Sequence, residues 1–158
     1  MDRPKLRILF LAKDKPFAKE AAELLAGQGI EEIIFFGDIG DPFPASAIGK
    51  TYEYVISYIS PWIVPKSVLD SAKSAINFHP GPPEYPGIGC TNFALYNQEK
   101  EFGITVHHMV EKVDSGTIIT TERFPIFPGE SVYSLTQRCY AYIHIAFLKL
   151  LPRILSGE

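Results

Sequence analysis

Three polar residues in this sequence have the types needed for proton transfer at a carbonyl group. Asn77 and His79 stand two residues apart at the end of an apolar segment, and Asp114 lies in the turn Asp114-Ser115-Gly116. On a strand, residues two apart project to the same side. An imidazole can accept a proton near neutral pH, and a carboxamide N–H can stabilise charge on a carbonyl oxygen. Together the three residues predict acyl transfer, although each one alone is more often structural.

The elements that must position these residues alternate between strand and helix patterns. Residues 6–12, 32–36, 54–59 and 75–78 have the composition of short buried strands, and residues 16–26 have the apolar spacing of a helix that begins at Pro16. This alternation predicts an α/β fold with a Rossmann-like, doubly wound, mostly parallel sheet and helices on both faces. Residues 37–53 are rich in Gly, Asp and Pro and oppose a long helix, so we expect an abbreviated N-terminal half.

The second half of the sequence continues with shorter elements. The sequence predicts a helix over residues 91–98 that is capped by Thr91. It also predicts strands over 103–110, 117–121 and 124–126, and a long amphipathic helix that opens at Ser131. Six of the 13 prolines fall between Pro61 and Pro86. A loop this stiff holds its shape before a ligand arrives, which lowers the cost of ordering it on binding.

Composition and charge exclude several other classes of protein. The chain has 158 residues, a length that predicts a single domain over residues 1–158. Its net charge of −3 and the lack of a basic run make nucleic acid an unexpected partner. Two separated cysteines, no signal-peptide pattern and no long apolar run predict a soluble cytoplasmic protein without a membrane partner. The first predicted strand lacks a glycine-rich phosphate loop after it, which disfavours dinucleotide and nucleotide-hydrolase functions, and no metal-binding motif is present.

Several segments together resemble the folate-dependent formyltransferase family. They are Ile76-Asn77-Phe78-His79-Pro80, the proline-rich loop with Tyr85-Pro86-Gly87, Gly103-Ile104-Thr105-Val106-His107, and Val113-Asp114-Ser115-Gly116 with Ile118-Ile119. That family includes glycinamide ribonucleotide transformylase, methionyl-tRNA formyltransferase and the sugar N-formyltransferases. The resemblance extends from about residue 54 to residue 158, and the loop after His79 is more similar to the sugar-modifying branch. It implies that residues 1–158 form a single formyltransferase catalytic domain without a C-terminal accessory domain.

The resemblance implies a cosubstrate and a set of site residues. Asn77, His79 and Asp114 match the catalytic residues of a family that uses 10-formyltetrahydrofolate without a metal. The implied cosubstrate contacts are Ser60, Pro61, Trp62, Ile63, Val68, Val110, Val113 and Ser115, and the implied acceptor contacts are Glu84, Tyr85 and Gly87. Trp62 is alternatively a core residue. His107 matches a histidine of the family, and both a structural and a catalytic role stay open for it.

The acceptor of the formyl group is the least defined part of this hypothesis. We expect a small-molecule amine, in the first place an amino sugar attached to a nucleotide. The alternatives are hydrolysis of 10-formyltetrahydrofolate, methionyl-tRNA formylation and a non-catalytic folate-binding module. The last predicted helix carries Tyr133, Tyr140 and Phe147 on one side, and these rings can pack internally or across a homodimer, so a monomer and a homodimer are both open.

Overall fold

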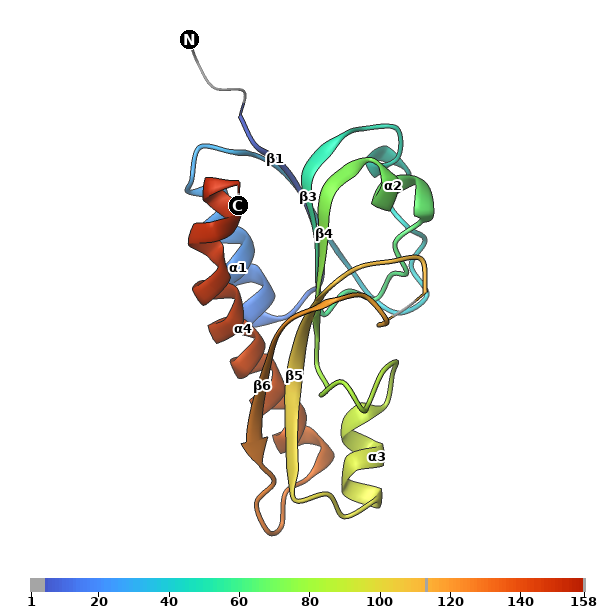
Figure 1. The fold of residues 1–158 in the computed structure, drawn as a ribbon, viewed down its shortest axis with the longest axis vertical. Helices are drawn as coiled ribbons and strands as arrows, with labels where there is room; N and C mark the ends of the chain where they lie inside the picture. The colour runs from blue at the N-terminus through green and yellow to red at the C-terminus, as the bar shows by residue number, and fades with distance from the viewer. Residues whose placement is uncertain (1–4, 113, 158) are drawn as a thin grey trace.

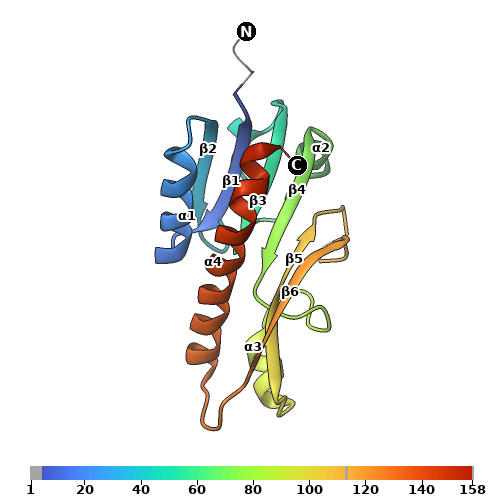
Figure 2. The ribbon, with the colours of Figure 1, turned by 60° about the vertical axis from the view of Figure 1, so that its left-hand side comes forward.

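A single six-stranded sheet organises the chain. The computed structural model describes residues 5–112 and 114–157. The strands follow the order β2-β1-β3-β4-β5-β6 across the sheet, which Figure 2 shows in a side view. Their bounds are β1 (Arg7–Lys13), β2 (Glu31–Gly37), β3 (Tyr52–Tyr58), β4 (Ala72–His79), β5 (Glu101–His108) and β6 (Ile118–Pro125). The first four strands pair in parallel, whereas β5 and β6 are antiparallel to their neighbours, so the predicted Rossmann-like, mostly parallel sheet is confirmed.

Helices cover the two faces of this sheet unequally. Helices α1 (Pro16–Ala26) and α4 (Val132–Ser156) lie on one face, and the short α2 (Lys66–Asp70) lies on the other, as Figure 1 shows. Between β2 and β3 the structure has only the 3-10 turn η1 (Ala45–Ala47). The predicted abbreviation of this crossover is therefore present, and its consequence is that β2 forms one edge of the sheet.

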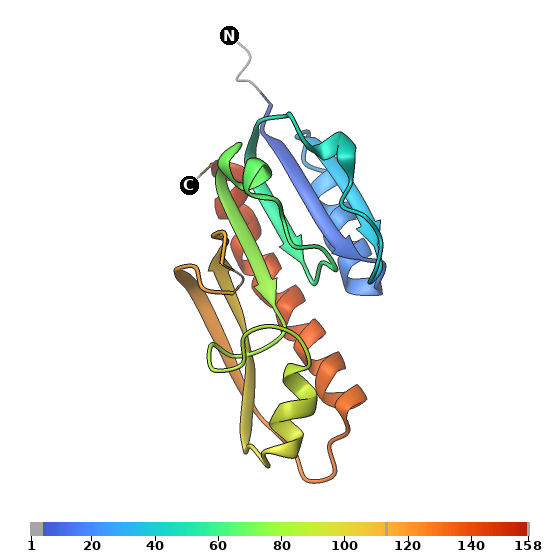
Figure 3. The ribbon, with the colours of Figure 1, turned by 90° about the vertical axis from the view of Figure 1, so that its right-hand side faces the viewer.

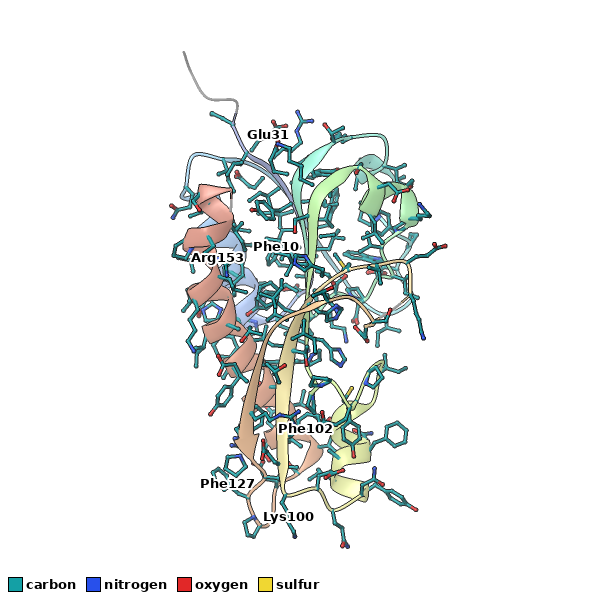
Figure 4. All side chains as sticks on the ribbon, in the orientation of Figure 1. Phe10, Glu31, Lys100, Phe102, Phe127 and Arg153 are labelled. Atoms are coloured by element: carbon teal, nitrogen blue, oxygen red, sulfur yellow. The ribbon has the colours of Figure 1, made fainter. Side chains whose placement is uncertain are left out.

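A cluster of aromatic side chains joins the sheet to α4. Phe10, Tyr58, Phe78 and Phe147 are fully buried, and their ring centroids lie between 5.6 and 6.3 Å apart in five contacting pairs. Phe10, labelled in Figure 4, lies on the side of the sheet that faces α1 and α4. Edge-to-face aromatic pairs of this kind add about 0.5–1.5 kcal/mol each beyond the burial of their surface. The cluster fixes the strands β1, β3 and β4 against one helix.

The antiparallel part of the sheet extends beyond the ends of the parallel strands. Figure 3 shows β5, β6, α3 (Cys90–Tyr96) and the first turns of α4 forming the lower part of the molecule. The carboxyl ends of β1, β3 and β4 therefore lie near the middle of the molecule, next to the loop that follows β4. This is the position at which an open parallel sheet binds its ligands.

Two local predictions in this part were wrong. The N-cap of α3 is Gly89, with φ +73°, and not Thr91, whose hydroxyl instead hydrogen-bonds Thr136 at 3.1 Å. Residues 118–125 form one strand, β6, in place of the two strands predicted over 117–121 and 124–126, because the pairing with β5 runs without interruption from Glu101 to Val106. Among the described residues, no helix is both long and apolar enough to cross a membrane.

Candidate active site

A cavity of about 350 Å³ lies at the carboxyl ends of β1, β3 and β4. One wall is apolar and carries Trp62, Ile63, Val64, Leu69, Met109 and Val110. Other parts of the lining carry polar groups of β1, α3 and α4, namely Lys13, Thr91, Thr136 and Tyr140. Asn77, His79, His107 and Asp114 line the same cavity. Its size falls in the range of small-molecule sites, and it places titratable groups between an apolar and a polar wall.

Asn77, His107 and Asp114 form a closed triangle of polar atoms. Asn77 Nδ2 lies 3.0 Å from Asp114 Oδ1 and 3.1 Å from His107 Nε2, and His107 Nε2 lies 3.2 Å from Asp114 Oδ1. The three distances are nearly equal, so each angle is roughly 60°, whereas the two N–H bonds of an amide diverge by about 120°. Only one N–H of Asn77 can point into the triangle. The other N–H remains for a ligand in the cavity.

The imidazole of His79 is fixed by a backbone carbonyl. Its Nε2 lies 2.8 Å from the carbonyl oxygen of Tyr85, and its exposed fraction is 5%. A carbonyl oxygen only accepts hydrogen bonds, so Nε2 carries a proton and Nδ1 is the atom that gains or loses one. Nδ1 lies 3.7 Å from Asp114 Oδ2, which is beyond hydrogen-bond distance.

The thiol of Cys90 supports the same loop. Cys90 Sγ lies 3.1 Å from the carbonyl oxygen of Tyr85 and 3.3 Å from that of Gly87, and it contacts His79 Nε2 at 3.7 Å. Burial, followed by the negative charge of Asp114, raises the pKa of this thiol to about 11. The thiol is therefore a protonated donor that braces the loop after His79, and not a nucleophile.

The loop between β5 and β6 holds Asp114 in an unusual backbone conformation. Asp114 has φ +53°, in the left-handed region that Asp tolerates better than most residues. A Cβ atom on Gly116 would lie 1.6 Å from the carbonyl oxygen of His108, so only glycine allows the chain to return to β5 here. The backbone N–H of Gly87 donates to Asp114 Oδ2 at 2.8 Å. The loop after β4 thus fixes one carboxylate oxygen, and Asn77 of β4 and His107 of β5 fix the other.

Opposing physical effects act on the charges of this site. Burial alone lowers the pKa of His107, but its contacts with the Asp114 carboxylate and the His108 carbonyl outweigh burial and hold that pKa above 6.5. Burial alone raises the pKa of Asp114, but the hydrogen bond from His107, the nearby His79 and the N–H of Gly87 hold it below 3.8. The geometry therefore favours a negative carboxylate with two imidazoles beside it.

The family model described as "Formyl transferase" matches residues 52–151, which is more than half of the chain. The chain belongs to the formyl transferase family. A curated relative, the trifunctional purine biosynthetic protein adenosine-3 of Chironomus tentans, is 45% identical over 83 residues. That alignment covers 52% of this chain and 6% of the relative, so the chain spans a small part of the relative's length.

Solved structures of formyl transferases share the fold. A 4-N formyltransferase from Francisella tularensis superposes with a TM-score of 0.81 at 20% identity, over 99% of this chain and 72% of that one. The formyltransferase from Anoxybacillus kamchatkensis superposes with a TM-score of 0.73 at 18% identity, over 96% of this chain and 77% of that one. The latter structure is a complex with UDP-4,6-dideoxy-4-formamido-L-AltNAc and tetrahydrofolate.

Most residues predicted for this formyl transferase site line the cavity. They are Asn77, His79 and Asp114, the predicted cosubstrate contacts Ser60, Pro61, Trp62, Ile63 and Val110, and the predicted acceptor contact Gly87. Trp62 also has a structural role, since its Nε1–H donates to the carbonyl oxygen of Asp41 at 3.1 Å. Val113 lies outside the described residues.

Four predicted contacts lie away from the cavity wall. Val68 is buried in the core beneath α2, and its neighbour Leu69 lines the cavity instead. Ser115 is exposed, and its hydroxyl donates to the carbonyl oxygen of Lys112 at 2.7 Å. The exposed Glu84 forms a bidentate pair with Arg123, at 2.7 and 3.0 Å.

Tyr85 is the fourth of these residues, and it contacts the site through its backbone. Its hydroxyl donates to Glu99 at 2.8 Å and its ring packs on Phe102, away from the cavity, while its carbonyl oxygen holds His79. The ring of Tyr85 thus anchors the loop to β5 and to the segment after α3, and an acceptor contact from Tyr85 stays a prediction.

Sequence reasoning missed several residues of the cavity wall. Lys13 follows the first strand and Ile59 follows the third, and Ile59 has φ +52°, a strained value for a β-branched residue. Thr136 and Tyr140 come from the first half of α4. A basic residue directly after the first parallel strand was the one available signal, since that position lies at the ligand-binding edge. Among the described residues, no three His, Cys, Asp or Glu side chains gather as a metal site would require.

Proposed function

We propose that this protein transfers the formyl group of 10-formyltetrahydrofolate to the amine of an amino sugar carried on a nucleotide. The observation that carries the proposal is the set of Asn77, His79 and Asp114 on one cavity, between an apolar wall and a wall with a lysine. Acyl transfer needs a donor for the carbonyl oxygen, a group that moves a proton and a carboxylate that orients it. Asn77 Nδ2 donates to Asp114 Oδ1 at 3.0 Å, and His79 Nδ1 lies 3.7 Å from Oδ2 of the same carboxylate.

The apolar wall fits the flat ring system of a reduced folate. Trp62 and Ile63 follow β3, and Met109 and Val110 follow β5, so two loops form opposite sides of a slot. Ser60 Oγ accepts the backbone N–H of Trp62 at 3.1 Å, which fixes the turn that carries the first two. Pro61 has no N–H, so its backbone can only accept hydrogen bonds from a ligand. The neighbouring structure with bound tetrahydrofolate supports this assignment.

Each residue of the site has a defined task in this reaction. The bound cosubstrate supplies an activated formyl group. The free N–H of Asn77 stabilises the negative charge that develops on the formyl oxygen as the amine attacks. Since Tyr85 holds the Nε2–H of His79, the amine proton passes to Nδ1, and His79 returns it to the folate nitrogen when the bond to the formyl carbon breaks. An oxyanion donor of this kind contributes about 2.7–4 kcal/mol to catalysis.

Lys13 supports an acceptor that carries a phosphate. It is half-buried on the cavity wall, and within the described part of the chain no carboxylate lies at ion-pair distance from it. An ammonium group in a concave site attracts a phosphate or diphosphate. The neighbour from Anoxybacillus kamchatkensis binds a UDP-linked formamido sugar, which supports a nucleotide-linked amino sugar in preference to a neutral amine.

Release of tetrahydrofolate from 10-formyltetrahydrofolate tests the proposal. The assay compares reactions without an amine, with simple amines and with nucleotide-linked amino sugars, and uses His79→Ala as the inactive control. We expect release that depends on one nucleotide-linked amine and is lost in the control. Release without any amine, also lost in the control, would indicate hydrolysis, and release with methionyl-tRNA alone would indicate initiator tRNA formylation. Folate binding without release under any condition would indicate a binding module and would contradict the proposal.

A further inference from the structure

His107 differs from the other histidines because both of its ring nitrogens face oxygen atoms that only accept hydrogen bonds. Its exposed fraction is 3%. Nδ1 lies 2.9 Å from the carbonyl oxygen of His108, and Nε2 lies 3.2 Å from the carboxylate oxygen Oδ1 of Asp114. Nε2 also lies 3.1 Å from Asn77 Nδ2, whose N–H donates to the same Oδ1 at 3.0 Å, so two donors converge on one carboxylate oxygen. A neutral imidazole has one N–H and would turn a lone pair toward one of these oxygens. An imidazolium satisfies both.

The carboxylate of Asp114 is closer to His107 than to His79. Its Oδ1 accepts hydrogen bonds from His107 Nε2 and Asn77 Nδ2, and its Oδ2 accepts one from the backbone N–H of Gly87. His79 Nδ1 lies 3.7 Å from Oδ2 without a hydrogen bond. The ion pair of this site is therefore His107 with Asp114, and His79 stands beside a pair whose charges largely cancel.

We propose that His107 is a positioning residue that, as an imidazolium, neutralises Asp114 and so leaves Nδ1 of His79 free to exchange a proton during catalysis. The inference rests on the proposed function for its catalytic consequence. Its structural part, a doubly protonated His107 paired with Asp114, stands on the two distances at His107 alone.

The surroundings of His107 hold no other group that takes this role. Strand β6 places the apolar Ile118 opposite it, and the ring centroid of His79 on β4 lies 6.5 Å away. The remaining titratable side chains on the same cavity are Lys13 at the end of β1, Cys90 of α3, Tyr140 of α4 and Glu111 of the β5–β6 loop. In the described part of the chain, Asp114 is the one carboxylate within 4 Å of His107.

Replacing His107 by a neutral hydrogen-bond donor removes the positive charge of its ring but keeps a hydrogen bond to Asp114. In His107→Gln, a side-chain N–H can still reach Asp114, but the positive charge is gone. The carboxylate then acts on His79 Nδ1 without a competing cation and favours the protonated imidazole. The pH dependence of any catalytic step that requires proton exchange at His79 therefore shifts to higher pH.

The first test is the pH dependence of kcat for His107→Gln, with His108→Gln as the matched control. His108 is the adjacent exposed histidine, and only its backbone carbonyl contacts His107. We expect the midpoint of the profile to rise by about one pH unit in His107→Gln. On the low-pH side, kcat falls about tenfold and recovers at higher pH, while KM for 10-formyltetrahydrofolate stays within threefold. A merely structural defect would lower kcat at every pH.

The second test does not depend on activity. NMR of the ring nitrogens in histidine-labelled wild-type protein reports the protonation of each imidazole, and the chain has only four histidines, which single variants assign. We expect His107 to be doubly protonated at pH 7 and to lose this state in Asp114→Asn. A singly protonated His107 at pH 7, or pH profiles of His107→Gln and wild type that coincide, would overturn the inference. If no amine accepts a formyl group, the proposed function fails while the NMR result still decides the state of His107.

Discussion

Gly81 provides a sharp perturbation of the proposed active site, because its missing side chain leaves room for His79. A Cβ atom at this position would lie 2.9 Å from His79 Nε2, 3.0 Å from the Tyr85 carbonyl oxygen and 3.1 Å from Cys90 Sγ. Ordinary van der Waals contact begins at 3.4 Å. In Gly81→Ala the added methyl group therefore enters the space beside the hydrogen bond between His79 and Tyr85.

The size of the effect follows from these distances. The imidazole must retreat by about 0.5 Å to restore ordinary contact, which stretches the 2.8 Å bond from Nε2 to the Tyr85 carbonyl or breaks it. Misplacement of a reacting group by about 1 Å costs roughly 10²-fold in rate, so a shift of about 0.5 Å costs roughly tenfold, which corresponds to about 1.4 kcal/mol. Straining one buried hydrogen bond costs about 1–3 kcal/mol of stability, which lowers Tm by roughly 3–10 °C for a domain of this size.

The assay measures kcat for formyl transfer at a temperature well below the Tm of every variant. Gly27→Ala is the control, since Gly27 has φ −74° and its added Cβ meets only atoms at 3.7 and 3.8 Å. We expect Gly81→Ala to lose about tenfold in kcat with KM for 10-formyltetrahydrofolate within threefold, and Gly27→Ala to match wild type. A folded Gly81→Ala enzyme with kcat within threefold of wild type would refute the role given to the His79–Tyr85 contact.

Three further predictions concern the oxyanion donor, the acceptor site and the buried ion pair. Asn77→Ala should lower kcat by 10²–10³ without loss of folate binding. Steady-state kinetics measures the first effect and equilibrium titration with folate measures the second, and an unchanged kcat would remove Asn77 from the mechanism. Lys13→Met should raise KM for a phosphate-bearing amine at least tenfold, whereas Lys15→Met on the exposed side of the same loop should not; equal effects would exclude Lys13 as the phosphate contact. His107→Gln should lose about 3 kcal/mol of stability below pH 6.5, since removing one member of a buried pair leaves the other charge uncompensated. Because the pKa of His107 is raised in the folded protein, this pair contributes stability below pH 6.5 that disappears as pH rises through the folded-state pKa. The difference in free energy of unfolding between wild type and variant, measured by urea denaturation, should therefore narrow in alkaline solution. A difference that is constant with pH would contradict the pairing.

The order of elements was predictable because each carries a local signal. Pro16 and the apolar spacing after it predict a helix over residues 16–26, and α1 has these bounds. The buried strand at Ala75-Ile76-Asn77-Phe78 correctly placed Asn77 and His79 at a sheet end, since residues two apart on a strand share a side. Thr91 failed as a cap because Gly89 adopts the left-handed conformation and starts α3 one residue earlier.

The parts of the site that arise from tertiary contacts were not predictable. Lys13 and Tyr140 are 127 positions apart and line the same cavity only because the fold brings the end of β1 and the first half of α4 to it. The burial of Val68 in the core was not predictable, since a helix of five residues shows too little periodicity to separate its face toward the sheet from that of Leu69. The pairing of Asp114 with His107 instead of His79 depends on the positive φ of Asp114 and on the approach of Gly116 to β5, which no sequence spacing encodes.

The most direct test of the central claim follows an isotopically labelled formyl group. The labelled cosubstrate is mixed with a nucleotide-linked amino sugar and either wild type or Asp114→Asn, which keeps the size of the side chain and removes its charge. We predict that wild type moves the label to the sugar nitrogen as a formamide, and that Asp114→Asn does so at least 10²-fold more slowly while still binding folate. Label recovered only as free formate, or transferred equally well by both proteins, would contradict the account.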